Sequence, residues 1–173
     1  MYEITNAYVQ ELPATRFIGI KYQDEDRVNG GFGTQWGEWF QNNRFEKLEG
    51  LLSEEFNKSY EDAGAYVGLM RWKEGEPFQY WIGMFLPVGS EVPEGYGHVD
   101  LAGGKLGVAW IHGQEGELYC HEDKCAERIA KEGYEIISDE EGAWWFFERY
   151  VCPRFTTPDA EGNVTLDICH FIK

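Results

Sequence analysis

The fold is decided by the stretch Gly142-Ala143-Trp144-Trp145-Phe146-Phe147-Glu148-Arg149-Tyr150-Val151-Cys152. It is too short to cross a membrane. Large aromatic and β-branched side chains favour the half-buried surface of a sheet, so the stretch predicts a central strand. Because side chains alternate between the two faces of a strand, one face carries a single carboxyl among three aromatic rings: Trp144, Phe146, Glu148 and Tyr150.

Glu148 is the candidate functional residue. A carboxylate among aromatic rings loses hydration unless a cation pairs with it, so we expect Glu148 to attract a cation or to hold a proton. The alternative is an ion pair with Arg149 or Lys105 across the sheet, and Arg149 is a poor partner because adjacent residues point to opposite faces. Tyr150 shares the face of Glu148, and its hydroxyl could bond either Glu148 or a ligand.

The composition bounds the class of protein. The 173 residues suffice for one well-buried domain, 1–173, or for two small fused halves. Fifteen Lys and Arg against 31 Asp and Glu give a net charge of −16. Such a charge repels phosphate backbones and anionic membranes, so we expect no direct nucleic-acid binding and no membrane binding. It would favour cationic ligands, although an acidic surface also serves solubility.

No cofactor or metal is expected. His121 and Cys125 lie four residues apart, a spacing that a metal can use on a helix, with Cys120 beside them. There is no Cys-x-x-Cys pair, however, and Cys125 falls on the apolar side of its helix. The glycine-rich stretch 30–33 lacks the lysine of a phosphate-binding loop. The four cysteines show no disulfide-rich spacing and no apolar leader follows Met1, so the prediction is a cytoplasmic protein with reduced thiols.

The first half, about residues 1–100, predicts strands at 2–9, 14–22, 65–72 and 77–87. Trp36, Trp39 and Phe40 begin a helix over 34–52, which the asparagines at 42 and 43 could kink or split. Helix packing on a sheet explains these three rings, and Trp39 could also close one end of a groove. The stretches 53–64 and 90–104 are expected to be connections, because the first is polar and the second is rich in Gly and Pro.

The second half, 101–173, repeats the same order of elements. It predicts a strand at 105–112, a helix at 117–131, a short segment at 134–137, and strands at 142–152 and 164–172. Each half thus runs strand, helix, strand, strand. The simplest architecture is an α+β fold with one antiparallel sheet, two helices on one face and an approximate two-fold axis. A ligand groove is expected at the join of the halves and on the sheet face without helices.

Four short stretches carry a resemblance to a known family. They are Leu12–Arg16, Phe78–Gly83, Gly103–Gly113, and Phe147–Tyr150 followed by Leu166–Ile168. Together they resemble the GyrI-like, or effector-binding, domain that is fused to AraC-type and MerR-type multidrug regulators and also occurs as a free-standing protein. The match spans nearly the whole chain and departs from the family at 169–173, where the family usually has a proline-containing tail. No helix-turn-helix pattern accompanies it.

The resemblance implies a pocket for bulky, flat, often cationic molecules, in which a glutamate near the last strands opposes the charge of the ligand. Glu148 matches that glutamate. The expected function is a stand-alone protein that sequesters or senses such molecules. The expected groove residues are Glu148, Tyr150, Trp144, Phe146, Tyr80 and Trp110, with Trp39 at one end, although core packing would explain Tyr80 and Trp110 equally well.

The resemblance also implies two alternatives. Some similar free-standing proteins hydrolyse strained cyclopropane-bearing DNA alkylators, and in that case Glu148 would be the general base and Tyr150 a catalytic hydrogen-bond donor. Others bind DNA gyrase, so gyrase or a regulator is a possible protein partner. The sequence does not separate these three roles.

Overall fold

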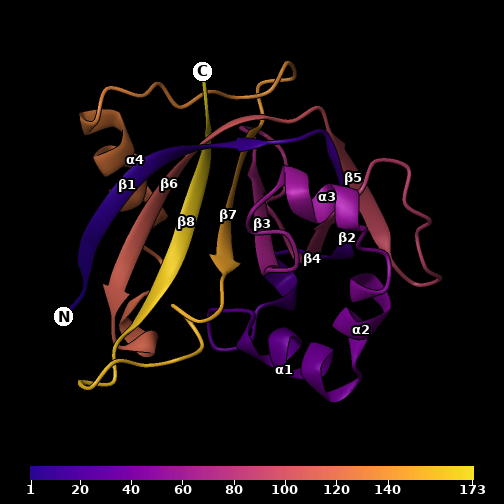
Figure 1. Cartoon of the computed structure of the whole chain (residues 1–173), viewed down its shortest axis with the longest axis horizontal. Helices are drawn as coiled ribbons and strands as arrows, with labels where there is room; N and C mark the ends of the chain where they lie inside the picture. The colour runs from indigo at the N-terminus through magenta and orange to yellow at the C-terminus, as the bar shows by residue number, and fades with distance from the viewer.

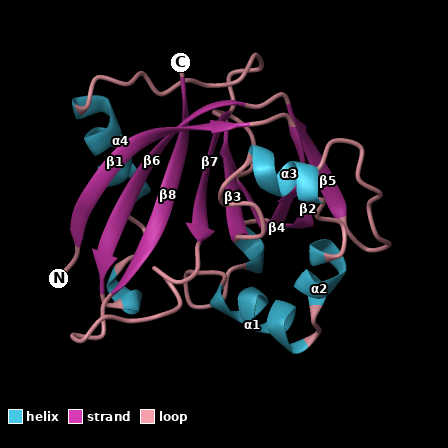
Figure 2. Cartoon of the chain, viewed as in Figure 1, coloured by secondary structure: helices cyan, strands magenta, loops and turns pink.

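The computed structural model describes residues 1–173 as one eight-stranded antiparallel sheet with four α-helices (Figures 1 and 2). The strand order is β1-β6-β8-β7-β3-β4-β2-β5. The strands are β1 (Glu3–Leu12), β2 (Thr15–Tyr22), β3 (Tyr66–Trp72), β4 (Gln79–Leu86), β5 (Gly97–Leu101), β6 (Gly104–Gly113), β7 (Trp144–Tyr150) and β8 (Val164–Ile172). The helices are α1 (Gly33–Gln41), α2 (Arg44–Glu49), α3 (Glu54–Ser59) and α4 (Glu122–Lys131).

The expected two-fold arrangement is confirmed. In the first half β2 is followed by helices and then by β3 and β4, and in the second half β6 is followed by α4, β7 and β8. The two halves meet where β3 pairs with β7, so the aromatic strand lies at the centre of the sheet as predicted. The strand that precedes each unit pairs with the other unit. β1 precedes β2 and pairs with β6, and β5 precedes β6 and pairs with β2.

Helices cover both faces of the sheet. On one face, α1 and α2 pack Trp39, Phe45 and Leu48 against β2 and β4, and α4 packs Cys125 and Ile129 against β6 and β8. These elements are the predicted pair of helices on one face, with the first one split. Asn43 in the left-handed region (φ 52°) separates α1 from α2, because Asn tolerates this conformation better than most residues do.

The predicted connection over 53–64 is wrong in part, because it contains α3. The Ser53 side chain accepts a hydrogen bond from the Phe56 backbone N–H at 3.1 Å and so caps this helix. Phe56 and Tyr60 are buried against the opposite face of the sheet, next to Phe85 and Phe147. A short helix with two buried rings gives little periodic signal within a polar segment, so the sequence pattern did not reveal it.

Two further predictions need correction. The stretch 90–104 contains β5, a short edge strand whose Gly97 pairs with Gly19, and its glycines concealed it. The helix predicted over 117–131 begins only at Glu122. It is preceded by a 3-10 turn at Glu115–Glu117 and by Cys120, whose φ of 68° cannot continue a right-handed helix.

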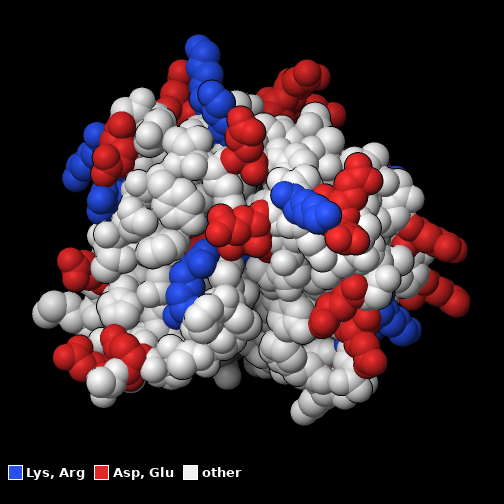
Figure 3. Space-filling model, in the orientation of Figure 1, with Lys and Arg blue, Asp and Glu red and all other residues white.

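The surface agrees with the net charge. Figure 3 shows carboxylates spread over one side of the molecule with Lys and Arg between them. No helix of the chain has the length and the apolar character needed to cross a bilayer.

Candidate functional site

A cavity of about 1420 Å³ lies at the join of the two halves. Its floor is formed by β3 and β7, whose register pairs Met70 with Phe146 and Gly68 with Glu148. The next pair along the strands is Tyr66 with Tyr150. The join was therefore the correct place to expect a groove. The other expectation, a groove on a sheet face without helices, is wrong. The cavity lies on the face that carries α1 and α4, and α3 covers part of the opposite face.

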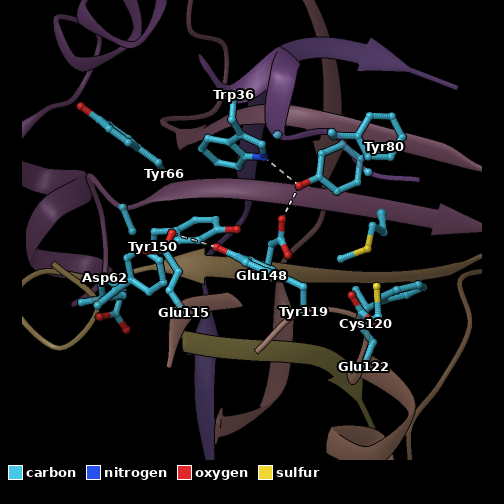
Figure 4. A pocket seen from close by; sticks show the side chains of 18 of the residues that line it. Trp36, Asp62, Tyr66, Tyr80, Glu115, Tyr119, Cys120, Glu122, Glu148 and Tyr150 are labelled. Carbon is cyan, nitrogen blue, oxygen red and sulfur yellow. Dashed lines mark hydrogen bonds between the residues drawn. The ribbon is translucent and has the colours of Figure 1, made fainter. Parts of the chain in front are cut away.

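Glu148 lies at the middle of the floor and is only 6% exposed. The Tyr80 hydroxyl donates a hydrogen bond to Glu148 Oε1, and the Trp36 indole N–H donates to the Tyr80 hydroxyl at 2.9 Å (Figure 4). Gly68 makes this pairing possible. A Cβ built on Gly68 would lie 2.5 Å from the Tyr80 hydroxyl and 2.6 Å from Glu148 Oε1. The carboxyl and the phenol therefore meet over a position that has no side chain.

Burial raises the pKa of Glu148 to about 7, although hydrogen bonds from Tyr80 and Tyr150 act in the opposite direction. Burial also raises the pKa of Tyr80 and of Tyr150, and the charge of Glu148 raises both further. Both phenols are therefore neutral hydrogen-bond donors near pH 7. Of these three groups, Glu148 is the one whose pKa lies near neutral pH, and no Lys or Arg forms an ion pair with it.

Aromatic rings form the walls around the carboxyl. The Phe32 ring stacks on Tyr80 with centroids 4.2 Å apart and planes 5° apart. Trp36, carried by α1, meets the Tyr150 ring edge to face at 4.9 Å. Figure 4 shows Tyr119 near Glu148, on the side opposite Tyr80. Such an enclosure offers the negative faces of several rings to a flat or cationic guest.

The charges of the lining residues are strongly unequal. Arg27 is the single Lys or Arg among them, against seven carboxyl side chains: Glu49, Glu61, Asp62, Glu115, Glu122, Asp123 and Glu148. His170 also lines the cavity, but burial lowers its pKa to about 4, so its ring is neutral near pH 7. The cavity is therefore suited to a cation and not to an anion.

Comparison with known proteins shows which solved structures share this fold. No protein-family model and no curated protein matches the sequence. Solved structures do match, and one of them is SAV2435 bound to tetraphenylphosphonium. It is 16% identical with a TM-score of 0.64, and the match covers 98% of this chain and 94% of that one. The chain has a GyrI-like fold.

Two further structures share the GyrI-like fold. One is a Staphylococcus aureus MU50 protein provisionally assigned to bacterial transcription regulation. It is 15% identical with a TM-score of 0.61, and the match covers 97% of this chain and 98% of that one. The other is EcmrR in a complex with DNA, 10% identical with a TM-score of 0.56. That match covers 99% of this chain and 57% of the EcmrR chain.

Within this GyrI-like fold, four of the seven expected groove residues line one cavity: Glu148, Tyr150, Phe146 and Tyr80. The other three are not brought into it. Trp144 shares the face of Glu148 but lies at the start of β7, where it is 38% exposed. Trp110 lies on the opposite face of the sheet, beside Tyr8 and under the Arg154 guanidinium at 4.9 Å. Trp39 is fully buried and donates to the Tyr22 hydroxyl at 2.9 Å.

Several lining residues were missed as site residues. Trp36 was assigned to helix packing, because helical spacing alone does not tell which ring of α1 faces the core and which faces the cavity. Phe32 and Tyr119, which line the cavity, carry no sequence signal of their own, and neither does Gly68, which lies against Glu148 and Tyr80. Their role depends on which strands and loops are neighbours in the GyrI-like fold.

The structure also places Arg149 and the residues at metal-like spacing. Arg149 points to the opposite face, where it bonds Asp167, so it does not neutralise Glu148. His121 stacks on Tyr2, and Cys125 is fully buried on the inner side of α4. The chain contains no group of three His, Cys, Asp or Glu side chains that could hold a metal ion.

Proposed function

We propose that the protein binds bulky aromatic cations in this cavity, as a stand-alone protein that sequesters or senses them. The observation that carries the proposal is Glu148, a buried carboxyl enclosed by aromatic rings with no Lys or Arg paired to it. A bound cation would supply the positive charge that an ionised, buried Glu148 needs as a partner. SAV2435, which has the same fold, is bound to tetraphenylphosphonium, and this ligand belongs to the proposed class.

Binding of a cation would displace the proton of Glu148. The carboxyl has a pKa of about 7 in the free protein, so at neutral pH a large share of the molecules carries a neutral Glu148. A cation favours the ionised form, and the neighbouring phenols of Tyr80 and Tyr150 remain available as donors to it. The aromatic walls contribute cation–π contacts, each worth about 0.5–2 kcal/mol depending on desolvation.

We predict that the affinity for tetraphenylphosphonium rises with pH and levels off above about pH 7. Below the pKa of Glu148 the affinity should fall by about tenfold per pH unit, because the cation must expel one proton. The measurement is a titration between about pH 5 and pH 9 that follows the quenching of tryptophan fluorescence, to which Trp36 in the cavity wall contributes. Neutral triphenylphosphine oxide, which has three of the four phenyl rings and no charge, is the comparison ligand, and its affinity should not rise with pH. An identical pH profile for both ligands would contradict the proposal.

Hydrolysis of a strained cyclopropane-bearing electrophile is the second candidate, and the pKa of Glu148 favours it. A general base works best when its pKa lies near the working pH. Tyr150 or Tyr80 could then donate to the atom where charge develops. Turnover that Glu148→Gln abolishes, while substrate still binds, would support this activity. A wild-type protein that binds such a substrate and leaves it unconverted would exclude it.

A further inference from the structure

The cavity is longer than one aromatic cation requires. Its volume of about 1420 Å³ exceeds the roughly 300–1,000 Å³ that is usual for sites of drug-sized ligands. Its floor follows β3 from Met70 through Gly68 to Tyr66, and Glu148 pairs with the middle residue. At about 3.3 Å per residue this floor is about 13 Å long. Cavity therefore extends to both sides of Glu148.

The two ends of the cavity differ in charge: the Met70 end carries Arg27 together with Glu122, and the Tyr66 end carries Glu49 and no Lys or Arg. At the Met70 end, the Arg27 guanidinium lies 4.6 Å from the Phe32 ring, and Phe32 in turn stacks on Tyr80. The Arg27 guanidinium therefore already covers one face of the Phe32 ring at this end of the cavity. At the other end, the Tyr66 hydroxyl donates to Glu49 on α2 at 2.6 Å, and no Lys or Arg lines this end. In Figure 4, Tyr66 and Tyr80 lie on opposite sides of Glu148.

The Tyr66 end also has the aromatic surface of a cation site. The Tyr66 ring stacks on Phe45 at 3.7 Å, which fixes its orientation, and Phe40 lies 6.0 Å away at an angle of 50°. Phe40 remains 56% exposed although it lines the cavity. Two rings at an angle beside a carboxylate are the arrangement that quaternary ammonium groups prefer.

We propose that Phe40, Tyr66 and Glu49 form a second cation subsite, and that the cavity accommodates elongated dications. One charge of the ligand pairs with Glu148 and the other with Glu49. At the Met70 end the Arg27 guanidinium already lies over the Phe32 ring, so this aromatic face is not open to a second ligand cation. Tyr66 lies two residues along β3 from Gly68, the residue paired with Glu148, which is about 7 Å, and this spacing sets the scale of the linker between the two charges. This inference rests on the proposed binding of cations at Glu148.

The test uses two ligands that differ only in one charge. Both are alkyltriphenylphosphonium ions, one ending in a trimethylammonium group and the other in the isosteric, neutral tert-butyl group, each with linkers of increasing length. Glu49→Gln keeps an acceptor for Tyr66 and removes the charge. It should weaken the ammonium-tailed ligand about three- to tenfold and leave the tert-butyl ligand unchanged. Phe40→Ala should weaken both, because the ring contacts either tail.

The control is Glu46→Gln, which removes an exposed charge from the same helix outside the cavity and should change neither ligand. If Glu49→Gln affects both ligands equally, or affects neither, the second subsite is overturned even though both ligands bind. If the wild-type protein binds neither ligand, or if Glu148→Gln leaves both affinities intact, the proposed function itself fails. The two failures are therefore distinguishable.

Discussion

Glu148→Gln is expected to weaken the binding of tetraphenylphosphonium by about 30-fold to several thousand-fold. The bound cation loses the buried carboxylate with which it pairs, and this loss costs about 2–5 kcal/mol. Glutamine keeps the shape of the side chain and can still accept the hydrogen bond from Tyr80. Calorimetry at about pH 8 is the suitable measurement, since Glu148 is then largely ionised in the wild-type protein.

Two comparisons make this result specific. Neutral triphenylphosphine oxide should bind both proteins with similar affinity, because the substitution removes charge and not volume. Glu115→Gln removes another lining carboxyl, one that is exposed and bonded to Tyr119, and it should weaken the cation by less than about fivefold. A loss of equal size for the cation and for the neutral ligand would remove Glu148 from the role assigned to it.

Arg149→Leu is expected to lower the free energy of unfolding by about 3–5 kcal/mol, because it breaks a buried ionic network that joins β7 and β8 to the segment after α3. The Arg149 guanidinium is fully buried, 2.7 Å from Asp167 and 3.1 Å from Asp62. It also donates to Tyr60 at 2.8 Å and to Gln10 at 2.7 Å. Without it, Asp167 keeps Arg154 as its remaining cationic partner.

Urea unfolding followed by tryptophan fluorescence measures this loss. The control is Lys58→Gln, which breaks an exposed pair with Glu54 and should change stability by less than about 0.5 kcal/mol. A loss below about 1 kcal/mol for Arg149→Leu would show that the network does not hold β7 and β8 to the α3 segment. Arg149 and Glu148 point to opposite faces of β7, but Asp62, a partner of Arg149, also lines the cavity, so stability is measured without ligand.

The sequence predicts the two-fold sheet and the central residue of the site because both depend on local patterns. Alternation along β7 separates Glu148 from Arg149, and the structure places them on opposite faces. The same rule could not place Trp110. Alternation shows that neighbouring residues point to different faces, but it does not show which of the two faces lines the cavity. That assignment requires the pairing of β6 with β1 and β8.

The features that were missed depend on contacts between distant segments. Glu148 on β7 and Tyr80 on β4 meet across β3, which lies between these two strands. They can meet only because β3 has Gly68, without a side chain, at the point of contact. No pattern within β3 signals this. Likewise Trp36 and Trp39 both fit a buried helix face, and only the position of α1 over the join turns Trp36 toward the cavity and Trp39 into the core.

The central claim is that an aromatic cation binds beside Glu148 in this cavity, and the location of a bound ligand tests it most directly. Tetraphenylarsonium has the shape and charge of tetraphenylphosphonium, and its arsenic atom gives an anomalous X-ray signal. Crystals grown with it at about pH 8 should show one strong arsenic peak between Trp36, Tyr150 and the Glu148 carboxyl. Crystals of Glu148→Gln grown in the same way should lack it. A peak on the outer acidic surface, with the cavity empty of ligand, would contradict the account.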